Sequence, residues 1–277
     1  MSHAAPGQAA AGGLFASYWR YRHLIVQLAA RETAARYRGS LFGMAWTLLN
    51  PLIMLAIYTF VFVVVFKARW PGRAADMGSP EFAVIVFCGL ILHGFLSDCL
   101  THAPTQVVGN TSYVKKVVFP LEAIAWSHLG AALFQLLANF AILTVFQLFV
   151  FGLPPVTWLL FPFVLLPLVL FAQGCMWVLS AAAVYVRDIG QIVGWFATVL
   201  LFLAPILYPL EAVPEPMRSW LWLNPLTWVI EALRDVVLWG QLPSISTWVL
   251  MTVGGLAVCW LGLRVFERAR RGFADVL

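Results

Sequence analysis

The side chains best suited to chemistry in this sequence are its histidines, because imidazole titrates near neutral pH and binds metals. No HExxH pattern and no GxSxG motif occurs. Asp98 and His102 lie four residues apart, and we expect His128 to start a neighbouring helix on the same side. A hydrogen-bonded cluster is expected there rather than a proton relay. The five histidines are His3, His23, His93, His102 and His128. The sequence therefore indicates no catalytic residue and no metal site.

The lysines and cysteines also lack the patterns of a reactive site. A Walker A loop needs glycine before a lysine that is followed by Ser or Thr, and none of the three lysines has that context. We therefore expect no ATP, and no other cofactor, on this chain, and we expect it not to be an enzyme. The cysteines include no close pair and are expected to be buried apolar residues: Cys88, Cys99, Cys175 and Cys259.

The composition indicates that the helices carrying these side chains lie in a membrane. Of 277 residues, 62% are hydrophobic and 10% are charged, against about 25% charged in soluble domains. A spanning helix needs about 20 mostly apolar residues, because hydrocarbon cannot pair with backbone polar groups. The stretches between charged residues predict an all-α integral membrane protein with six transmembrane helices, at residues 42–66, 82–102, 123–151, 158–185, 190–209 and 245–264.

Basic residues predict the orientation, because Lys and Arg near span ends remain in the cytoplasm. By the predicted spans, twelve Lys and Arg residues fall on the face that carries both termini and five fall on the other face. Both termini should therefore be cytoplasmic. The net charge of +5 then reflects topology and contact with lipid headgroups, and a nucleic-acid partner is not expected.

Three segments outside the spans carry further information. Residues 1–13 look disordered, and residues 14–38 predict an amphipathic helix along the membrane surface, with a loose basic tail as the alternative. The cytoplasmic loop 104–120 could hold a short helix at residues 110–118 that docks a partner, or be a plain connector. The external segment 210–243 predicts two short helices that enter the bilayer partway, with local charge pairing around Glu231, Arg234 and Asp235.

Four sequence stretches carry a family resemblance. ARYRGSLFGMAWTLLNPLIMLAIYTFVF begins at Ala35, YVKKVVFPLE at Tyr113, YVRDI at Tyr185 and LNPLTWVIEALRD at Leu223. Together they resemble, in order, the permease subunits of ABC transporters that export polysaccharide. The branch that exports O-antigen or teichoic acid is the most similar.

The resemblance implies the type-2 ABC exporter fold, with residues 39–277 as the permease domain in the cell inner membrane. It implies a homodimer with two separate ATPase subunits, which would bind ATP and Mg²⁺, and a channel for lipid-linked polysaccharide. ATPase coupling would involve Arg31, Arg36, Tyr113, Lys115, Lys116, Arg187 and Asp188. The external gate would involve Glu211, Trp222, Asn224, Pro225, Glu231 and Arg234.

A sugar channel should present aromatic faces, because rings stack on the apolar faces of sugars. The candidates are Tyr58, Phe62, Phe66, Trp195, Phe196, Phe202 and Tyr208, although each ring could instead face lipid or another helix. The leading hypothesis is a permease that exports O-antigen of lipopolysaccharide. Teichoic-acid or capsule export, a permease for a small amphiphile or drug, and a membrane enzyme or secondary carrier remain alternatives.

Overall fold

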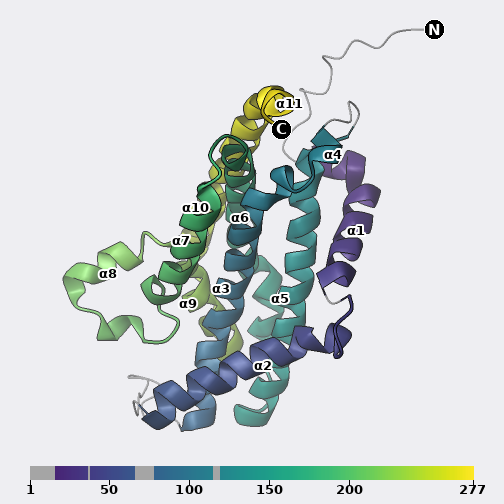
Figure 1. The fold of residues 1–277 in the computed structure, drawn as a ribbon. Helices are drawn as coiled ribbons and strands as arrows, with labels where there is room; N and C mark the ends of the chain where they lie inside the picture. Colours follow the sequence, from purple (N-terminus) through teal and green to yellow (C-terminus); the bar gives the residue numbers. More distant parts are fainter. Residues whose placement is uncertain (1–15, 37, 66–77, 115–118) are drawn as a thin grey trace.

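The computed structural model describes residues 16–36, 38–65, 78–114 and 119–277, and all the regular structure in these residues is helical (Figure 1). The described helices are α1 (Ala16–Arg36), α2 (Trp46–Thr59), α3 (Ser79–Val108), α4 (Thr111–Val114), α5 (Glu122–Val150), α6 (Phe161–Tyr185), α7 (Ile189–Leu203), α8 (Glu215–Leu221), α9 (Pro225–Arg234), α10 (Ile245–Ala269) and α11 (Phe273–Val276). Two π-helical turns extend α2 and α9, over Phe60–Val65 and Asp235–Trp239.

Five described helices are long and apolar enough to cross a membrane, namely Gly43–Val65, Pro80–Val108, Glu122–Val150, Val156–Tyr185 and Ile245–Val276. These correspond to five of the six expected spans. The sixth apolar helix, Ile189–Leu203, is shorter than the expected span 190–209. It ends early because Pro205 follows Ala204, whose backbone is extended at φ −112° and ψ 150°, as steric clash with the proline ring favours.

The helix α3 is longer than the expected span 82–102. It continues through Pro104 to Val108, so the expected loop at residues 104–120 is wrong for its first five residues. The short helix expected at residues 110–118 is confirmed for its first part as α4 (Thr111–Val114). Residues 115–118 lie outside the described part of the chain, and with them Lys115 and Lys116.

The helices α6 and α10 form the most extensive helix pair, and their backbones approach closely (Figure 1). A Cβ atom on Gly174 of α6 would lie 2.6 Å from the backbone N of Cys259, and one on Gly255 of α10 would lie 2.7 Å from the carbonyl O of Pro167. Glycine is therefore required at these crossings, as small residues are wherever membrane helices pack backbone to backbone. At the other end of the pair, Phe163 stacks on Trp248 with ring centroids 3.8 Å apart.

The helix α1 lies beside the first half of α5, with its start toward the end of the bundle that carries α4 and α11 (Figure 1). Ile25 is buried against this neighbour, and Tyr18 packs on Trp126 with ring centroids 5.2 Å apart. The expected helix at residues 14–38 is present. One of its faces packs on α5, while Trp19 and Val26, seven residues apart on another face, are exposed; its position along a membrane surface stays a prediction.

The helix α2 runs across α3 and α5 rather than parallel to them (Figure 1). Only two of its residues, Thr47 and Leu55, are buried, and the others are exposed or partly exposed. Gln135 on α5 donates a hydrogen bond of 2.9 Å to the carbonyl of Thr47, so a polar contact supports this crossing. The oblique path leaves a hollow beneath α2, described below.

Candidate functional site

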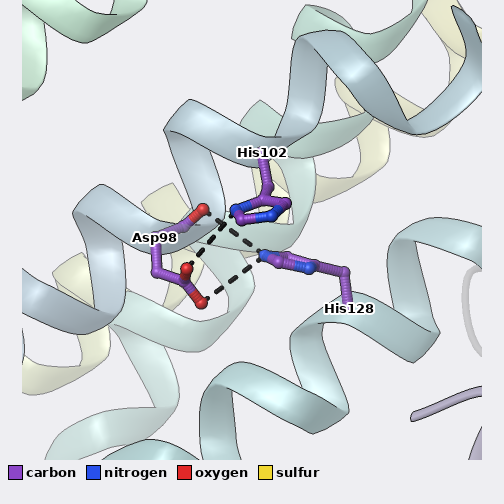
Figure 2. Close-up of side chains that lie close together, drawn as sticks. All are labelled: Asp98, His102 and His128. Carbon is purple, nitrogen blue, oxygen red and sulfur yellow. Dashed lines mark hydrogen bonds and ion pairs between the residues drawn. The ribbon is translucent and has the colours of Figure 1, made fainter. Parts of the chain in front are cut away.

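The polar residues of α3 and α5 meet in the cluster that the sequence predicted (Figure 2). On α3, Nδ1 of His102 lies 3.4 Å from Oδ1 of Asp98, one helical turn away. On α5, Nε2 of His128 lies 3.6 Å from Oδ2 of Asp98, and the two imidazole rings stack with centroids 4.5 Å apart. Both rings therefore direct a nitrogen toward the same carboxylate, and the expected hydrogen-bonded cluster is confirmed.

Two residues of α1 complete this polar cluster. Nη2 of Arg36 lies 3.1 Å from Oδ2 of Asp98, and Nδ1 of His128 pairs with the carboxylate of Glu32. The cluster of Glu32, Arg36, Asp98, His102 and His128 thus joins α1 to α3 and α5. Neither Glu32 nor the pairing of Arg36 with Asp98 could be found from spacing, because the partners lie far apart in the sequence.

A cavity of about 570 Å³ opens beside the polar cluster, between α2, α3 and α5. Its wall includes Arg36 and Asp98, and it also presents amides and aromatic rings: Trp46, Asn50, Tyr58, His93, Gln135 and Asn139. Gln135 donates to Oδ1 of Asn139 at 3.0 Å, which orients one of these amides. Aromatic faces next to amide groups can stack on and hydrogen-bond to a polar ligand such as a sugar.

The helices α8 and α9 form a hairpin between α7 and α10, which we call the α8–α9 hairpin. Asn224 caps α9 by accepting from the backbone N of Leu226 at 3.0 Å, and Pro225 follows at the first helical position, where its missing N–H is harmless. Trp222 and Trp228 pack with ring centroids 4.1 Å apart. Two short helices, α8 and α9, thus lie within residues 210–243, and their entry into the bilayer stays a prediction.

Arg234 anchors the hairpin in the protein interior, with 2% of its side chain exposed. Its guanidinium donates to the carbonyls of Ile85 and Ile206 at 3.3 and 3.2 Å. It also pairs with Oε1 of Glu231 at 2.7 Å, which confirms the predicted local charge pairing. Burial raises the pKa of Glu231, and the charge of Arg234 opposes that increase.

At the end of the bundle that carries α4, Arg270 connects the C-terminal segment to the turn before α5. Its Nη1 lies 2.9 Å from Oε2 of Glu122, and its Nη2 donates to the carbonyl of Phe119 at 3.0 Å. Phe119 in turn stacks on Tyr113 of α4, with ring centroids 4.4 Å apart. Sequence reasoning missed this connection, because the Arg270 pair spans most of the chain.

Comparison with known proteins gives the family. The sequence profile of the ABC-2 type transporter family matches residues 23–238, which is most of the chain. The chain belongs to the ABC-2 type transporter family. It is similar to the O-antigen export system permease protein RfbA of Myxococcus xanthus, at 28% identity over 93% of this chain and 96% of that protein. Two such proteins of Klebsiella pneumoniae are 26% and 25% identical, each over 92% of this chain and 95% of their own length.

Within this multi-pass permease, the residues expected to contact an ATPase divide into two groups. Arg187 and Asp188 are exposed in the turn between α6 and α7, and Arg31 is exposed on α1. Arg36 instead pairs with Asp98, and Tyr113 is half-buried against Phe119. The exposed residues are thus available to a partner, whereas Arg36 and Tyr113 already have partners within the chain.

The candidate channel residues also divide. Tyr58 lines the cavity, and Phe62 lies one turn further on, with its ring centroid 6.5 Å from that of Tyr58. Trp195, Phe196 and Phe202 are exposed on α7. The hydroxyl of Tyr208 donates to the carbonyl of Phe202 at 2.7 Å. Phe66 lies outside the described residues. The structure therefore brings Tyr58 to the polar cavity and leaves Trp195 and Phe202 exposed, while Phe196 lines a second, largely apolar cavity of about 780 Å³.

Proposed function

We propose that this chain is the transmembrane subunit of an ATP-driven transporter that exports a lipid-linked polysaccharide, the O-antigen of lipopolysaccharide, across the inner membrane. The observation that carries the proposal is its similarity along more than nine-tenths of its length to O-antigen export permeases. The family supplies the general class, an ABC permease. The polar and aromatic cavity beside Tyr58 supports a sugar as the cargo.

In this proposal two copies of the chain enclose the channel. The exposed rings of α7 and the largely exposed α2 are the apolar surfaces that a second copy or lipid would cover. Tyr58 and Phe62 face the path of the glycan. The α8–α9 hairpin, held by Arg234, serves as the external gate, and Glu211 and Trp222 lie on its outer part.

The ATPase subunits dock at the end of the bundle that carries α4 and the α6–α7 turn. The exposed pair Arg187 and Asp188 supports this placement. Movement of a docked ATPase could reach the last long helix through a chain of contacts. Tyr113 of α4 stacks on Phe119, whose carbonyl accepts from Arg270 at the end of α10. Both termini then lie in the cytoplasm, as the distribution of basic residues predicts.

The proposal is tested in proteoliposomes that contain this permease and its ATPase. Lipid-linked O-antigen should stimulate ATP hydrolysis, while a drug-like amphiphile should not. The permease without the ATPase provides the background rate. Stimulation by lipid-linked teichoic acid or capsular glycan instead would show that the substrate is a polysaccharide other than O-antigen. Stimulation by the amphiphile alone would refute the polysaccharide assignment.

A further inference from the structure

We infer that the Asp98, His102 and His128 side chains form a binding site for a divalent transition metal, with Zn²⁺ as the preferred ion. The sequence alone indicated no metal site. The three ligand atoms, one from each residue, all lie within 4.8 Å of one another, and Figure 2 shows them converging from two helices. The inference concerns ion binding and stands independently of the proposed cargo.

Two distances between imidazole nitrogens and the Asp98 carboxylate are close to those between neighbouring ligands of a tetrahedral zinc ion. Ligand bonds of about 2.0–2.2 Å at tetrahedral angles place neighbouring donor atoms about 3.4 Å apart. Nδ1 of His102 lies 3.4 Å from Oδ1 of Asp98. Nε2 of His128 lies 3.6 Å from Oδ2 of the same carboxylate. The three donor atoms all lie within 4.8 Å of one another, so an ion between the carboxylate and the two rings would draw them together by up to about 1.4 Å, to the spacing of about 3.4 Å.

Glu32 supplies the support that metal-binding histidines ordinarily have. Its carboxylate pairs with Nδ1 of His128, which leaves Nε2 directed at Asp98; in the metal-bound site Nδ1 would carry the proton and Nε2 would bind the ion. A carboxylate behind a ligating imidazole fixes the ring orientation and makes the ligand more basic. The side chain of His128 is 2% exposed, so the ring is also held by packing.

Arg36 occupies only part of the carboxylate. Its guanidinium contacts Oδ2 of Asp98 at 3.1 Å, whereas Oδ1 faces His102. An ion can therefore bind Oδ1 while Arg36 keeps Oδ2. The positive charge of Arg36 opposes cation binding and sets a moderate affinity. Asp98 and Arg36 both line the cavity, which gives an ion a path to the site and leaves room for a water molecule as fourth ligand.

The donor set selects the class of ion. Two imidazole nitrogens and one carboxylate oxygen suit Zn²⁺, Co²⁺ and Ni²⁺, whereas Ca²⁺ and Mg²⁺ prefer oxygen ligands alone. A bound ion would fasten α1, through Glu32 behind His128, to α3 and α5. The site would therefore fix the first helix of the permease against its membrane core.

Zinc titration of the full-length permease, purified in detergent through a tag without histidine, tests the inference. We expect one zinc ion per chain to remain bound through gel filtration, and Co²⁺ in its place to give the intense visible absorption of a tetrahedral site. His102→Gln, at a half-exposed side chain, should abolish retention of the ion. His23→Gln is the matched control, because His23 is exposed on α1 and outside the cluster.

Two further variants separate a metal site from a network of ion pairs alone. Glu32→Gln should weaken zinc binding by about 10–100-fold, and Arg36→Gln should strengthen it by removing an opposing charge. Cooperative thermal unfolding of the unsubstituted chain shows that the purified sample is folded. If such a sample retains no zinc, the inference is overturned. Equal retention by His102→Gln and His23→Gln, or weaker binding by Arg36→Gln, would also overturn it.

Discussion

Replacing Arg234 by alanine removes a buried cation that joins three segments of the fold. The carbonyls of Ile85 and Ile206 each lose a donor, and Glu231 loses its ion-pair partner. Breaking a buried ion pair by removing one partner costs about 3–5 kcal/mol. The side chain of Glu231 is 34% exposed, so water screens part of its charge. The expected loss of stability is therefore at the lower end, about 3 kcal/mol.

The loss can be measured by thermal unfolding in detergent with a dye that becomes fluorescent on reaction with thiols. Cys88 is fully buried on α3, one turn after Ile85, and Cys99 and Cys259 are buried free thiols as well, so the reaction reports opening of the helix bundle as a whole. About 2–4 °C of melting temperature per kcal/mol converts the expected loss into a decrease of roughly 6–12 °C. Arg218→Ala is the matched control, because Arg218 is only half-buried and bonds to carbonyls within the outer part of the hairpin.

A double variant identifies the source of the loss. Adding Glu231→Gln to Arg234→Met removes both charges while keeping much of the side-chain volume, and should recover at least about 1 kcal/mol relative to Arg234→Met alone. A melting temperature for Arg234→Ala within 2 °C of the parent chain would refute the reasoning. So would a double variant no more stable than Arg234→Met.

Three other predictions concern helix packing, the channel and the ATPase contact. Gly255→Ala should destabilise the permease by about 1–3 kcal/mol, because the new Cβ would meet the carbonyl of Pro167. Gly254→Ala is the control and should be neutral or stabilising, because a Cβ at that position has open space around it. Equal melting temperatures of the two variants would contradict this prediction. Tyr58→Ala and Phe62→Ala should reduce surface polysaccharide at normal permease levels, and unchanged export would exclude both rings from the channel. Lys115→Glu with Lys116→Glu should weaken co-purification of the ATPase without affecting membrane insertion, and undiminished recovery would argue against docking there.

The long helices could be predicted from sequence because charged residues are costly in hydrocarbon and mark where spans end. Charged residues do not show where a helix ends or continues at a proline. Pro205 ends α7 although the next charged residue is Glu211, and Pro104 lies within α3 although it was expected to begin a loop. Proline inside a membrane helix is tolerated when neighbouring groups satisfy the freed backbone atoms, and a single sequence does not show those neighbours.

The candidate sites were predictable only where their residues are close in sequence. The pairs Asp98 with His102 and Glu231 with Arg234 are one helical turn apart, so helical spacing indicated both. The contact of Arg36 with Asp98 and that of Arg270 with Glu122 join helices remote in sequence. The burial of Arg234 could not be predicted from the sequence, because only the fold brings the carbonyls of Ile85 and Ile206 to its guanidinium.

The close approach of α6 and α10 has a mechanical consequence. At the glycine positions their backbones are in direct contact, and at the other end Phe163 stacks on Trp248, so sliding of one helix along the other is opposed at both places. Packed backbone is poorly compressible, and we expect the pair to move as a single strut during transport. In the crossing helix α2 only Thr47 and Leu55 are buried, so it is packed less tightly against its neighbours. If two copies enclose a channel as proposed, we expect changes of its width to come from movement of α2 against the α6–α10 pair.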